Sequence, residues 1–359
     1  MIQHMKNRIL VLGWLLIAVS VATASPPQGY YDATQGLSGQ ALKTALYNTI
    51  KGHTELSYSD LWTAFQKTDK RPDGKVWDIY SNITNYVFGD DQDRGSGGTS
   101  ENQFYNREHS FPKSWFDDGY PMYTDLFHLY PSDKWVNGKR GNTPFGTVQT
   151  VTGTSANNYS KWGTSTESGA TLTVFEPADE LKGDMARTYF YMVTRYENVV
   201  ASWKSNANTE MLAGNSYPAL SNWGVKLLLA WHRNDPVSPK EINRNEVIYS
   251  QYQHNRNPYI DEPRLVEYIW GDSIGYAFLP TGSVGLERPM DDNRPKAYCS
   301  DCCWWVTAKA GQRLQVFDLL GRRLLATTLM NNPYRLDIPQ TGYLLLMIGT
   351  TPLYIVKDN

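Results

Sequence analysis

Two neighbouring stretches of this 359-residue chain read Asn106-Arg107-Glu108-His109 and Asp125-Leu126-Phe127-His128-Leu129-Tyr130-Pro131-Ser132-Asp133-Lys134-Trp135-Val136-Asn137-Gly138-Lys139-Arg140-Gly141-Asn142. Carboxylate and carboxamide oxygens can hold a hard divalent cation. A histidine can take a proton from water near neutral pH. Charge that grows on a phosphate can be neutralised by the cation or by an arginine. The two stretches therefore predict the chemistry of phosphodiester hydrolysis.

The second stretch also predicts a helix. Ser132 is expected as its N-cap, and Asp133 in the first turn suits the helix dipole. Gly138 and Gly141 weaken or end the helix. Asn137 is thereby expected near the C-terminal end.

Glu108 and His109 set a geometric condition on the first stretch. Neighbours in a regular strand point to opposite faces, so both can serve one site only if the strand ends, bulges or turns there. Pro112 is compatible with such a break.

The composition indicates whether the chain folds and whether its net charge could attract nucleic acid. Hydrophobic residues make up 41% of the chain and charged residues 19%, which indicates a folded protein. The formal net charge of −2 argues against electrostatic attraction of nucleic acid by the whole chain. Any such binding must come from local clustering of basic residues, for which the candidates are Lys113, Lys139, Arg140, Arg244 and Arg256.

The first 24 residues are typical of a secretory signal peptide. Lys6 and Arg8 precede an apolar run over 9–21, which is too short for a comfortable membrane span. Residues 22–24, Ala-Thr-Ala, fit a cleavage site. We expect an exported protein with no integral membrane segment after removal of the signal.

The three cysteines are Cys299, Cys302 and Cys303. Residues 25–298 contain none, so the main domain cannot rely on disulfides. The spacing of Cys299 and Cys302 favours a local disulfide or an incidental cluster over a redox or zinc site, because no second cysteine or histidine pair accompanies it.

Hydrophobic periodicity and capping residues predict a mainly helical domain. The predicted helices cover 38–50, 60–66, 184–200, 222–232, 239–253 and 261–271. Residues 76–80 alternate like a strand, 89–98 are predicted as a loop, and 150–170 as irregular.

The pattern changes after about residue 285. Short alternating runs at 314–318, 323–326, 334–337, 343–348 and 353–357 predict a small all-β module. The expected organisation is a signal peptide (1–24), a nuclease-type domain (25–285), a linker (286–298) and a β-rich module (299–359). The fold class is thus α+β.

Several long motifs resemble the bacterial endonuclease I family. They occupy 106–116 (Asn-Arg-Glu-His-Ser-Phe-Pro-Lys-Ser-Trp-Phe), 125–133, 136–146 (Val-Asn-Gly-Lys-Arg-Gly-Asn-Thr-Pro-Phe-Gly), 175–187, 231–238 and 255–261. The resemblance covers roughly residues 35 to 275. It implies an exported, sequence-nonspecific endonuclease of DNA and possible RNA substrates, built on a ββα-metal (His-Me finger) core, that leaves 5′-phosphate products.

The resemblance also implies roles for individual residues. His109 would be the general base at a strand end, facing the helix that bears Asn137. Glu108 and Asn137 would bind the metal, with Mg²⁺ the usual ion and Ca²⁺ or Mn²⁺ as alternatives.

Other residues of the two stretches have open or secondary roles. Arg140 is a candidate catalytic contact to phosphate, with a salt bridge to Asp133 or Asp125 as the alternative. Lys113 and Lys139 are candidate nucleic-acid contacts. Where this chain has Phe127, relatives often have a second histidine, which favours a structural role for the adjacent His128. Asp125, His128 and Asn142 are assigned to a supporting shell.

The C-terminal module resembles the sorting domain of the type IX secretion system. The similarity lies in 316–323, 340–345 and 354–357. It implies the secretion machinery as a partner, transit through the periplasm, and either release or attachment at the outer membrane surface.

Two other function classes compete with the nuclease. A surface protein that binds nucleic acid or glycan on a degenerate nuclease scaffold would have damaged catalytic positions, which are intact here. A metal hydrolase of another class, such as a protease, would need a His-Glu-x-x-His motif or a nucleophile elbow, and neither is found. His232 is predicted as a core residue rather than a catalytic one. Tyr189, Tyr191 and Tyr196 are predicted to pack in the core rather than stack on bases.

Overall fold

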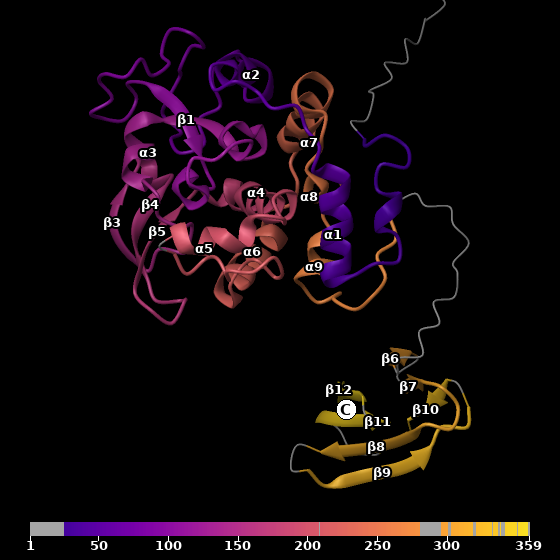
Figure 1. Ribbon diagram of the computed structural model, residues 1–359. Helices are drawn as coiled ribbons and strands as arrows, with labels where there is room; N and C mark the ends of the chain where they lie inside the picture. Colours follow the sequence, from indigo (N-terminus) through magenta and orange to yellow (C-terminus); the bar gives the residue numbers. More distant parts are fainter. Residues whose placement is uncertain are drawn as a thin grey trace, which may run out of the picture. The chain divides into compact units, whose positions relative to one another are not determined.

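The computed structural model divides after residue 282 into two units (Figure 1). The predicted signal peptide lies outside the described residues, as does most of the predicted linker. Helices in the part of the chain that the structure describes lack the length and apolar character needed to cross a membrane. The described residues are 25–207, 209–280, 296–300, 303–318, 321–331, 333–336, 338, 342–349 and 351–357.

The first unit is mainly helical, with two small antiparallel sheets. Its strands are β1 (Tyr105–His109) and β2 (Leu129–Asp133) in one sheet, and β3 (Thr150–Thr154), β4 (Lys161–Ser165) and β5 (Leu172–Glu176) in the other. Its α-helices are α1 (Gly39–Ile50), α2 (Asp60–Thr68), α3 (Lys134–Arg140), α4 (Lys182–Arg195), α5 (Trp203–Asn206), α6 (Asn222–Asn234), α7 (Pro239–Val247), α8 (Pro258–Asp261) and α9 (Leu265–Ile269).

The helices with strong local signals were predicted correctly. At the start of α7 the Ser238 hydroxyl accepts from the Glu241 amide, the Glu241 carboxylate accepts from the Ser238 amide, and Pro239 occupies the first position. The helix continues as a π-helical turn, Ile248–Gln253, which reaches the predicted end. Ser221 caps α6 in the same way, by accepting from the Gly224 amide.

The strand predicted at 76–80 is wrong. Only an isolated bridge joins Val76 to Lys70 there. Asp78 turns the chain instead, because its Oδ1 accepts hydrogen bonds from the amides of Tyr80 (2.8 Å) and Ser81 (3.2 Å). An aspartate that binds its own following amides competes with sheet formation.

The irregular segment predicted at 150–170 is also wrong, since β3 and β4 lie within it and pair with β5. Threonine favours strands, and this propensity outweighs the Gly, Ser and Asn content. At Gly163 a Cβ atom would lie 2.0 Å from the Thr150 carbonyl oxygen, so glycine is what lets the two strands approach.

The helix predicted at 261–271 is replaced by α8 and α9. Asn257 caps α8 by accepting from the Tyr259 amide, and Pro258 takes the first helical position. Asp261 therefore ends a helix rather than starting one. Its carboxylate instead binds Arg256, with Nε to Oδ2 at 2.8 Å.

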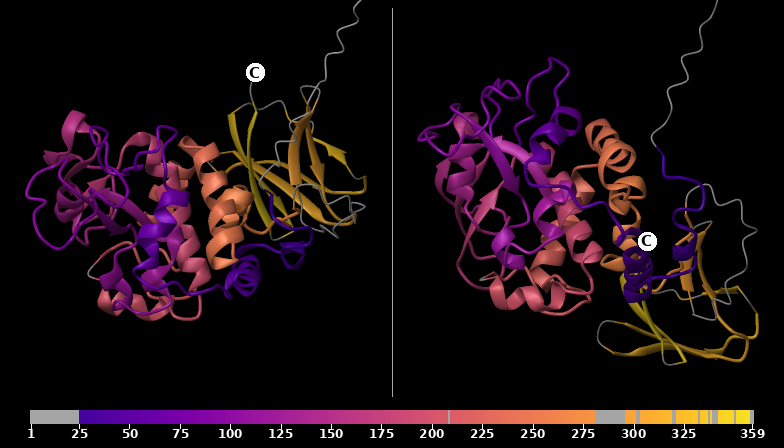
Figure 2. Two further views of the ribbon diagram at one scale, coloured as in Figure 1. Left: turned by 90° about the horizontal axis from the view of Figure 1, so that it is seen from above. Right: turned by 45° about the horizontal axis from the view of Figure 1, so that its top comes forward.

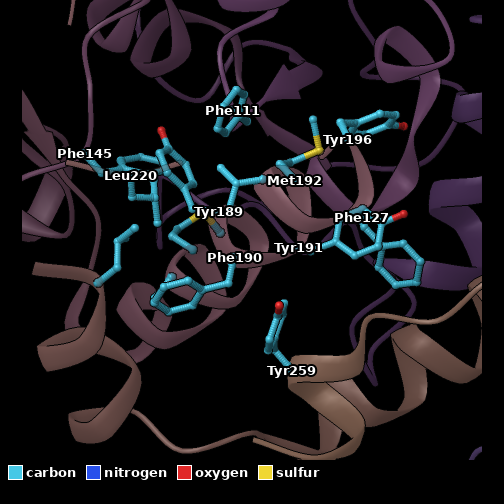
Figure 3. Packing of buried hydrophobic residues seen from close by; sticks show 14 of the residues in the cluster. Phe111, Phe127, Phe145, Tyr189, Phe190, Tyr191, Met192, Tyr196, Leu220 and Tyr259 are labelled. Atoms are coloured by element: carbon cyan, nitrogen blue, oxygen red, sulfur yellow. The ribbon is translucent and has the colours of Figure 1, made fainter. Parts of the chain in front are cut away.

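Helix α4 forms the centre of the first unit. Nearly all of its residues are buried, as expected of a helix that is covered on every side. Figure 3 shows Tyr189, Phe190, Tyr191 and Met192 of α4 pointing into different parts of the core. Strands β3 to β5 lie on one side of α4, and α7 to α9 on the other (Figures 1 and 2). The predicted packing role of Tyr189, Tyr191 and Tyr196 is confirmed, since all three are buried.

In its described residues the second unit contains two antiparallel sheets, as expected of the predicted β-rich module. Residues Val306, Leu314, Val316, Leu344 and Leu346 belong to its apolar core. The expected cysteine cluster falls on Cys302 and on the side chains of Cys299 and Cys303, which lie outside the described residues. One sheet has, in spatial order, the strands β10 (Tyr334–Arg335), β7 (Cys303–Thr307) and β6 (Lys296–Ser300). The other has β12 (Thr351–Lys357), β11 (Gly342–Ile348), β8 (Arg313–Asp318) and β9 (Arg323–Thr328).

Candidate active site

The two conspicuous stretches of the sequence form a strand–strand–helix unit. Strands β1 and β2 pair antiparallel, with Glu108 opposite Tyr130 and His109 opposite Leu129. Helix α3 begins directly after β2. Strand β1 ends at His109, as the adjacency of Glu108 and His109 requires if both are to serve one site.

A pocket of about 450 Å³ lies against this unit. It brings the side chains of Glu108, His109 and Asn137 to one cavity. Its lining residues are Tyr58, Asn106, Arg107, Glu108, His109, Pro112, Lys113, Lys134, Asn137, Gly138, Arg140, Gly141 and Asn142.

Glu108 lines the pocket and is buried. Its Oε1 accepts a hydrogen bond from the Tyr80 hydroxyl (2.8 Å) and pairs with Nη1 of Arg140 (3.1 Å). Burial raises the pKa of Glu108, while Arg140, Tyr80 and Asn137 act in the opposite direction. Both the Tyr80 and the Arg140 contact use Oε1 of the carboxylate.

The ring of His109 is fixed in one tautomer. Its Nε2 lies 2.9 Å from the carbonyl oxygen of Tyr123. A carbonyl oxygen only accepts, so Nε2 carries the hydrogen and Nδ1 keeps the lone pair. Burial, assisted by His128, lowers the pKa of His109 well below its usual value. The lowered pKa favours the neutral imidazole, which can accept a proton at Nδ1.

Asn137 is oriented by a second asparagine that the sequence analysis missed. Its Nδ2 donates to Oδ1 of Asn106 (2.9 Å), and the Ser132 hydroxyl donates to the same oxygen (3.2 Å). This leaves Oδ1 of Asn137 as its free oxygen. Asn106 and Glu108 are two residues apart in β1 and so share a face, which is a signal that the sequence does contain.

The N-cap of α3 is Asp133, not Ser132 as predicted. Oδ1 of Asp133 accepts from the amides of Trp135 and Val136, both at 2.9 Å. Ser132 cannot take this role because β2 continues through Asp133. Asn137 is the fourth of the seven residues of α3, so it lies at the middle of the helix and not near its C-terminal end as predicted.

Arg140 has different partners from those predicted. The expected salt bridge to Asp133 or Asp125 is wrong, because Arg140 pairs with Glu108. Its Nη1 also donates to the carbonyl of His109 (3.0 Å), and Nη2 donates to that of Ser110 (2.6 Å). Only 1% of the residue is exposed, so the guanidinium is a buried brace under the two central residues of the site.

The candidate nucleic-acid contacts separate into exposed and buried groups. Lys113 lines the pocket and pairs with Asp118 at 2.8 Å. Lys139 is exposed, with its ammonium 4.9 Å from the centre of the Trp135 ring, and it is not a lining residue.

Arg244 and Arg256 do not belong to a nucleic-acid surface, which corrects the prediction for both. Each is buried in an ion pair, Arg244 with Asp69 at 2.9 Å and Arg256 with Asp261 at 2.8 Å. They stabilise the core of the first unit.

Asp125 is buried outside the pocket. It accepts hydrogen bonds from the hydroxyls of Tyr191 (2.9 Å) and Tyr196 (2.8 Å) and from Nε2 of Gln253 (3.0 Å). These bonds tie the turn before β2 to α4 and the π-helical turn. Asp125 thus supports the strand rather than the site itself.

His128 and Asn142 differ in burial and in their relation to the pocket. His128 is buried, with Nε2 2.7 Å from the carbonyl of Met122 and its ring 5.4 Å from that of His109. This is the hydrogen-bonded surrounding that a structural role requires. Asn142 is exposed at the rim of the pocket.

Sequence reasoning also missed Tyr80 and Tyr123. Both contact the site from segments outside the two conspicuous motifs or between them, and their contacts to Glu108 and His109 arise only from folding. His232, by contrast, is buried with Nε2 3.1 Å from the Pro263 carbonyl, which agrees with the predicted core role.

The donor set of the pocket fits a hard divalent cation. In the part of the chain that is described, no group of three His, Cys, Asp or Glu residues is placed to hold a metal. The carboxylate of Glu108 and the carboxamide of Asn137 remain, and the amide of Asn137 is close enough to lower the pKa of Glu108. Mg²⁺ takes few protein oxygens and keeps several waters, whereas zinc sites use more nitrogen and sulfur ligands.

Comparison with known proteins identifies the family of this chain. Residues 38–264 match the endonuclease I family. An extracellular ribonuclease of Bacillus amyloliquefaciens is 37% identical over 255 residues, which cover 70% of this chain and 81% of the relative. An extracellular ribonuclease of Bacillus subtilis (strain 168) is 36% identical over 263 residues, with 71% and 83% covered. An endonuclease-1 of Buchnera aphidicola is 26% identical over 138 residues, with 38% and 44% covered. The chain therefore belongs to the endonuclease I family and is a nuclease.

Proposed function

We propose that this nuclease is an exported, sequence-nonspecific endonuclease that hydrolyses phosphodiesters of RNA and DNA with Mg²⁺ and leaves 5′-phosphate ends. The observation that supports it is the pocket that His109, Glu108 and Asn137 line together. We assign the unit of β1, β2 and α3 to the His-Me finger class on the same ground. The names of the Bacillus relatives support RNA as a substrate.

Each residue of the pocket has one task in this proposal. His109 accepts a proton from the attacking water at Nδ1, and its Nε2–H bond to Tyr123 keeps the ring in place. Glu108 and Asn137 would hold the cation through side-chain oxygens. The bound Mg²⁺ would neutralise charge on the phosphate and the leaving oxygen.

Arg140 acts through Glu108 in this mechanism. Its guanidinium is buried under the strand end and pairs with the carboxylate. Burial raises the pKa of Glu108, and the charge of Arg140 opposes that rise. We therefore assign it as a positioning residue in place of the direct phosphate contact first considered.

Export and final location rest on the ends of the chain. The predicted signal peptide and the extracellular relatives support secretion. The resemblance of the C-terminal module adds the type IX machinery as a partner and the cell surface as one destination.

Nicking of plasmid DNA and cleavage of a structured RNA by the mature protein test the proposal. We expect cleavage with Mg²⁺, none with EDTA, and a loss of at least about a hundredfold in His109→Ala, since general-base catalysis contributes 10²–10⁴-fold. His254→Ala, an exposed histidine outside the pocket lining, should cleave normally.

Two results would contradict the mechanism. Cleavage that persists in EDTA excludes the cation, and undiminished cleavage by His109→Ala excludes this base. Inactivity of the wild type with Mg²⁺, Mn²⁺ and Ca²⁺ would instead favour the binding-protein alternative.

A further inference from the structure

A strip of tyrosines runs from the general base to the protein surface. The ring of Tyr123 lies 5.0 Å from that of His109, and the ring of Tyr120 lies 5.3 Å further out. Tyr58 packs beside them, 4.8 Å from Tyr123 and 6.2 Å from His109. We call Tyr58, Tyr120 and Tyr123 the tyrosine strip.

The inner two rings are already in contact on several sides. The guanidinium of Arg107 lies 3.5 Å from the centre of the Tyr58 ring. Tyr123 contacts Tyr58, Tyr120 and His109, and the ammonium of Lys113 lies 5.3 Å from its centre. These neighbours leave the inner rings little room for another partner.

Tyr120 differs from both, because it is the outer member and is 53% exposed. The large aromatic residues of the first unit are otherwise mostly buried in its core. A phenol ring that is held from one side and open on the other is a stacking platform.

Two basic side chains lie beside the tyrosine strip and also line the pocket. Arg107 and Lys113 both contact strip tyrosines, and both line the pocket of Glu108 and His109. Aromatic rings beside a basic track are the combination that binds single-stranded nucleic acid, with phosphates on the cations and bases on the rings.

We propose that Tyr120 stacks on an unpaired base next to the scissile phosphate, so that the site favours single-stranded RNA or DNA. In a duplex the faces of each base are covered by its neighbours, and a single strand exposes them. This inference rests on the proposed nuclease function and assigns the substrate class of the same pocket.

Binding measurements separate this role from catalysis. In the His109→Ala background, a fluorescent single-stranded oligonucleotide is titrated onto Tyr120, Tyr120→Ala and Tyr120→Phe proteins. Because stacking of one base contributes about 1–3 kcal/mol, Tyr120→Ala should raise Kd roughly tenfold. Tyr120→Phe keeps the ring and should bind like the parent.

An abasic oligonucleotide of the same length is the decisive comparison, since it has the phosphates but no bases. Its affinity should not change with Tyr120→Ala. Equal weakening for the abasic and base-bearing strands, no weakening for either, or no binding by the parent would overturn the stacking role. In the His109 protein, Tyr120→Ala should raise KM for single strands more than for duplex DNA and leave kcat unchanged.

The binding result is independent of the cleavage result. If the wild type cuts no substrate, the proposed function fails while the stacking contact can still be observed. If it cuts normally and Tyr120→Ala weakens the binding of the abasic and base-bearing strands by the same factor, only the stacking proposal fails. Thermal melting of each variant checks the fold, which an exposed ring should barely affect.

Discussion

Glu108 and His109 are adjacent in the chain, yet they have separate surroundings. The carboxylate contacts Tyr80 and Arg140, whereas the imidazole contacts Tyr123 and lies beside His128. The strand end makes both accessible from one pocket. Each group can therefore be tuned by its own neighbours, and each gives a separate prediction.

The pH dependence of cleavage should report the low pKa of His109. Catalysis needs the neutral imidazole, so the rate is lost as pH falls through that pKa. Burial and the neighbouring His128 hold the pKa well below its usual 6.5. At saturating Mg²⁺ the acid limb of the pH–kcat profile should thus have its midpoint below pH 6.5. A midpoint above that value would contradict the assignment of the base.

Removal of Arg140 should damage both stability and metal binding. Arg140→Ala leaves Glu108 buried without its partner, at a cost of roughly 3–5 kcal/mol in the free energy of unfolding. Urea unfolding and Mg²⁺ titration by calorimetry measure the two effects. Arg140→Lys keeps the charge but not the fork of donors, so it should recover only part of each.

A double variant tests whether the lost ion pair causes the instability expected of Arg140→Ala. Glu108→Gln with Arg140→Met removes both charges, and it should be more stable than Arg140→Ala alone. If the two are equally unstable, the lost ion pair is not the reason.

Among the elements, α3 is the one that brings Asn137 to the site. The helix is short, so its intrinsic stability is small and its ends matter. The two carboxylate oxygens of Asp133 have different partners. Oδ1 caps α3, and Oδ2 accepts hydrogen bonds from the Tyr86 hydroxyl (2.6 Å) and the Asn102 amide (2.7 Å). The glycine-rich loop before β1 is thereby tied to the helix that follows β2.

Asp133→Ala should destabilise the protein more than an ordinary cap variant does. Loss of a cap costs about 1 kcal/mol, and a buried hydroxyl without an acceptor costs about 1–3 kcal/mol more. Chemical denaturation measures the sum. Ser132→Ala is the matched control, since the Ser132 hydroxyl donates only to Asn106 and should change stability little. Equal losses for both variants would restore Ser132 as the cap.

At the scale of the whole molecule, the first unit buries charged groups throughout its core. Arg187 pairs with Glu241, Arg244 with Asp69 and Lys43 with Glu197, all between segments far apart in the sequence. The segments that form these ion pairs also contribute apolar residues to the core around α4. Protonation changes in the core should therefore affect the entire unit.

His232 should contribute an acid sensitivity to global stability. It packs against Arg187 and the Pro263 carbonyl, and burial lowers its pKa to about 4. The unfolded chain binds a proton near pH 6.5 whereas the folded chain does not. Stability is thus complete above pH 6.5 and is lost as pH falls toward 4, by roughly 3 kcal/mol for this group.

His232→Gln removes this pH-dependent contribution to the free energy of unfolding. Urea unfolding at pH 7 and at pH 4 should show a smaller loss for the variant than for the wild type. His254→Gln, at an exposed site, is the control and should behave like the wild type. Identical losses in His232→Gln and wild type would show that His232 does not titrate with folding.

Sequence alone determined the features whose causes are local. The cap of α7 and the alternation of the C-terminal strands need only neighbouring residues, and both were predicted. Glu108, His109 and Asn137 were identified by their chemistry, and the pocket places all three together. Strands β3 and β4 were missed, because strand pairing depends on partners such as β5 that local composition does not reveal.

Only the tertiary structure decided which charged and aromatic groups serve the site. The sequence does not distinguish Arg140, Arg244 and Arg256 from surface arginines, but folding places all three in buried ion pairs. Lys113 stays partly exposed and Lys139 exposed. Folding also brings the hydroxyl of Tyr80 to Glu108, the carbonyl of Tyr123 to His109, and the exposed ring of Tyr120 to the end of the tyrosine strip. The physical reason is that burial and hydrogen bonding are properties of surroundings, and distant segments supply those surroundings.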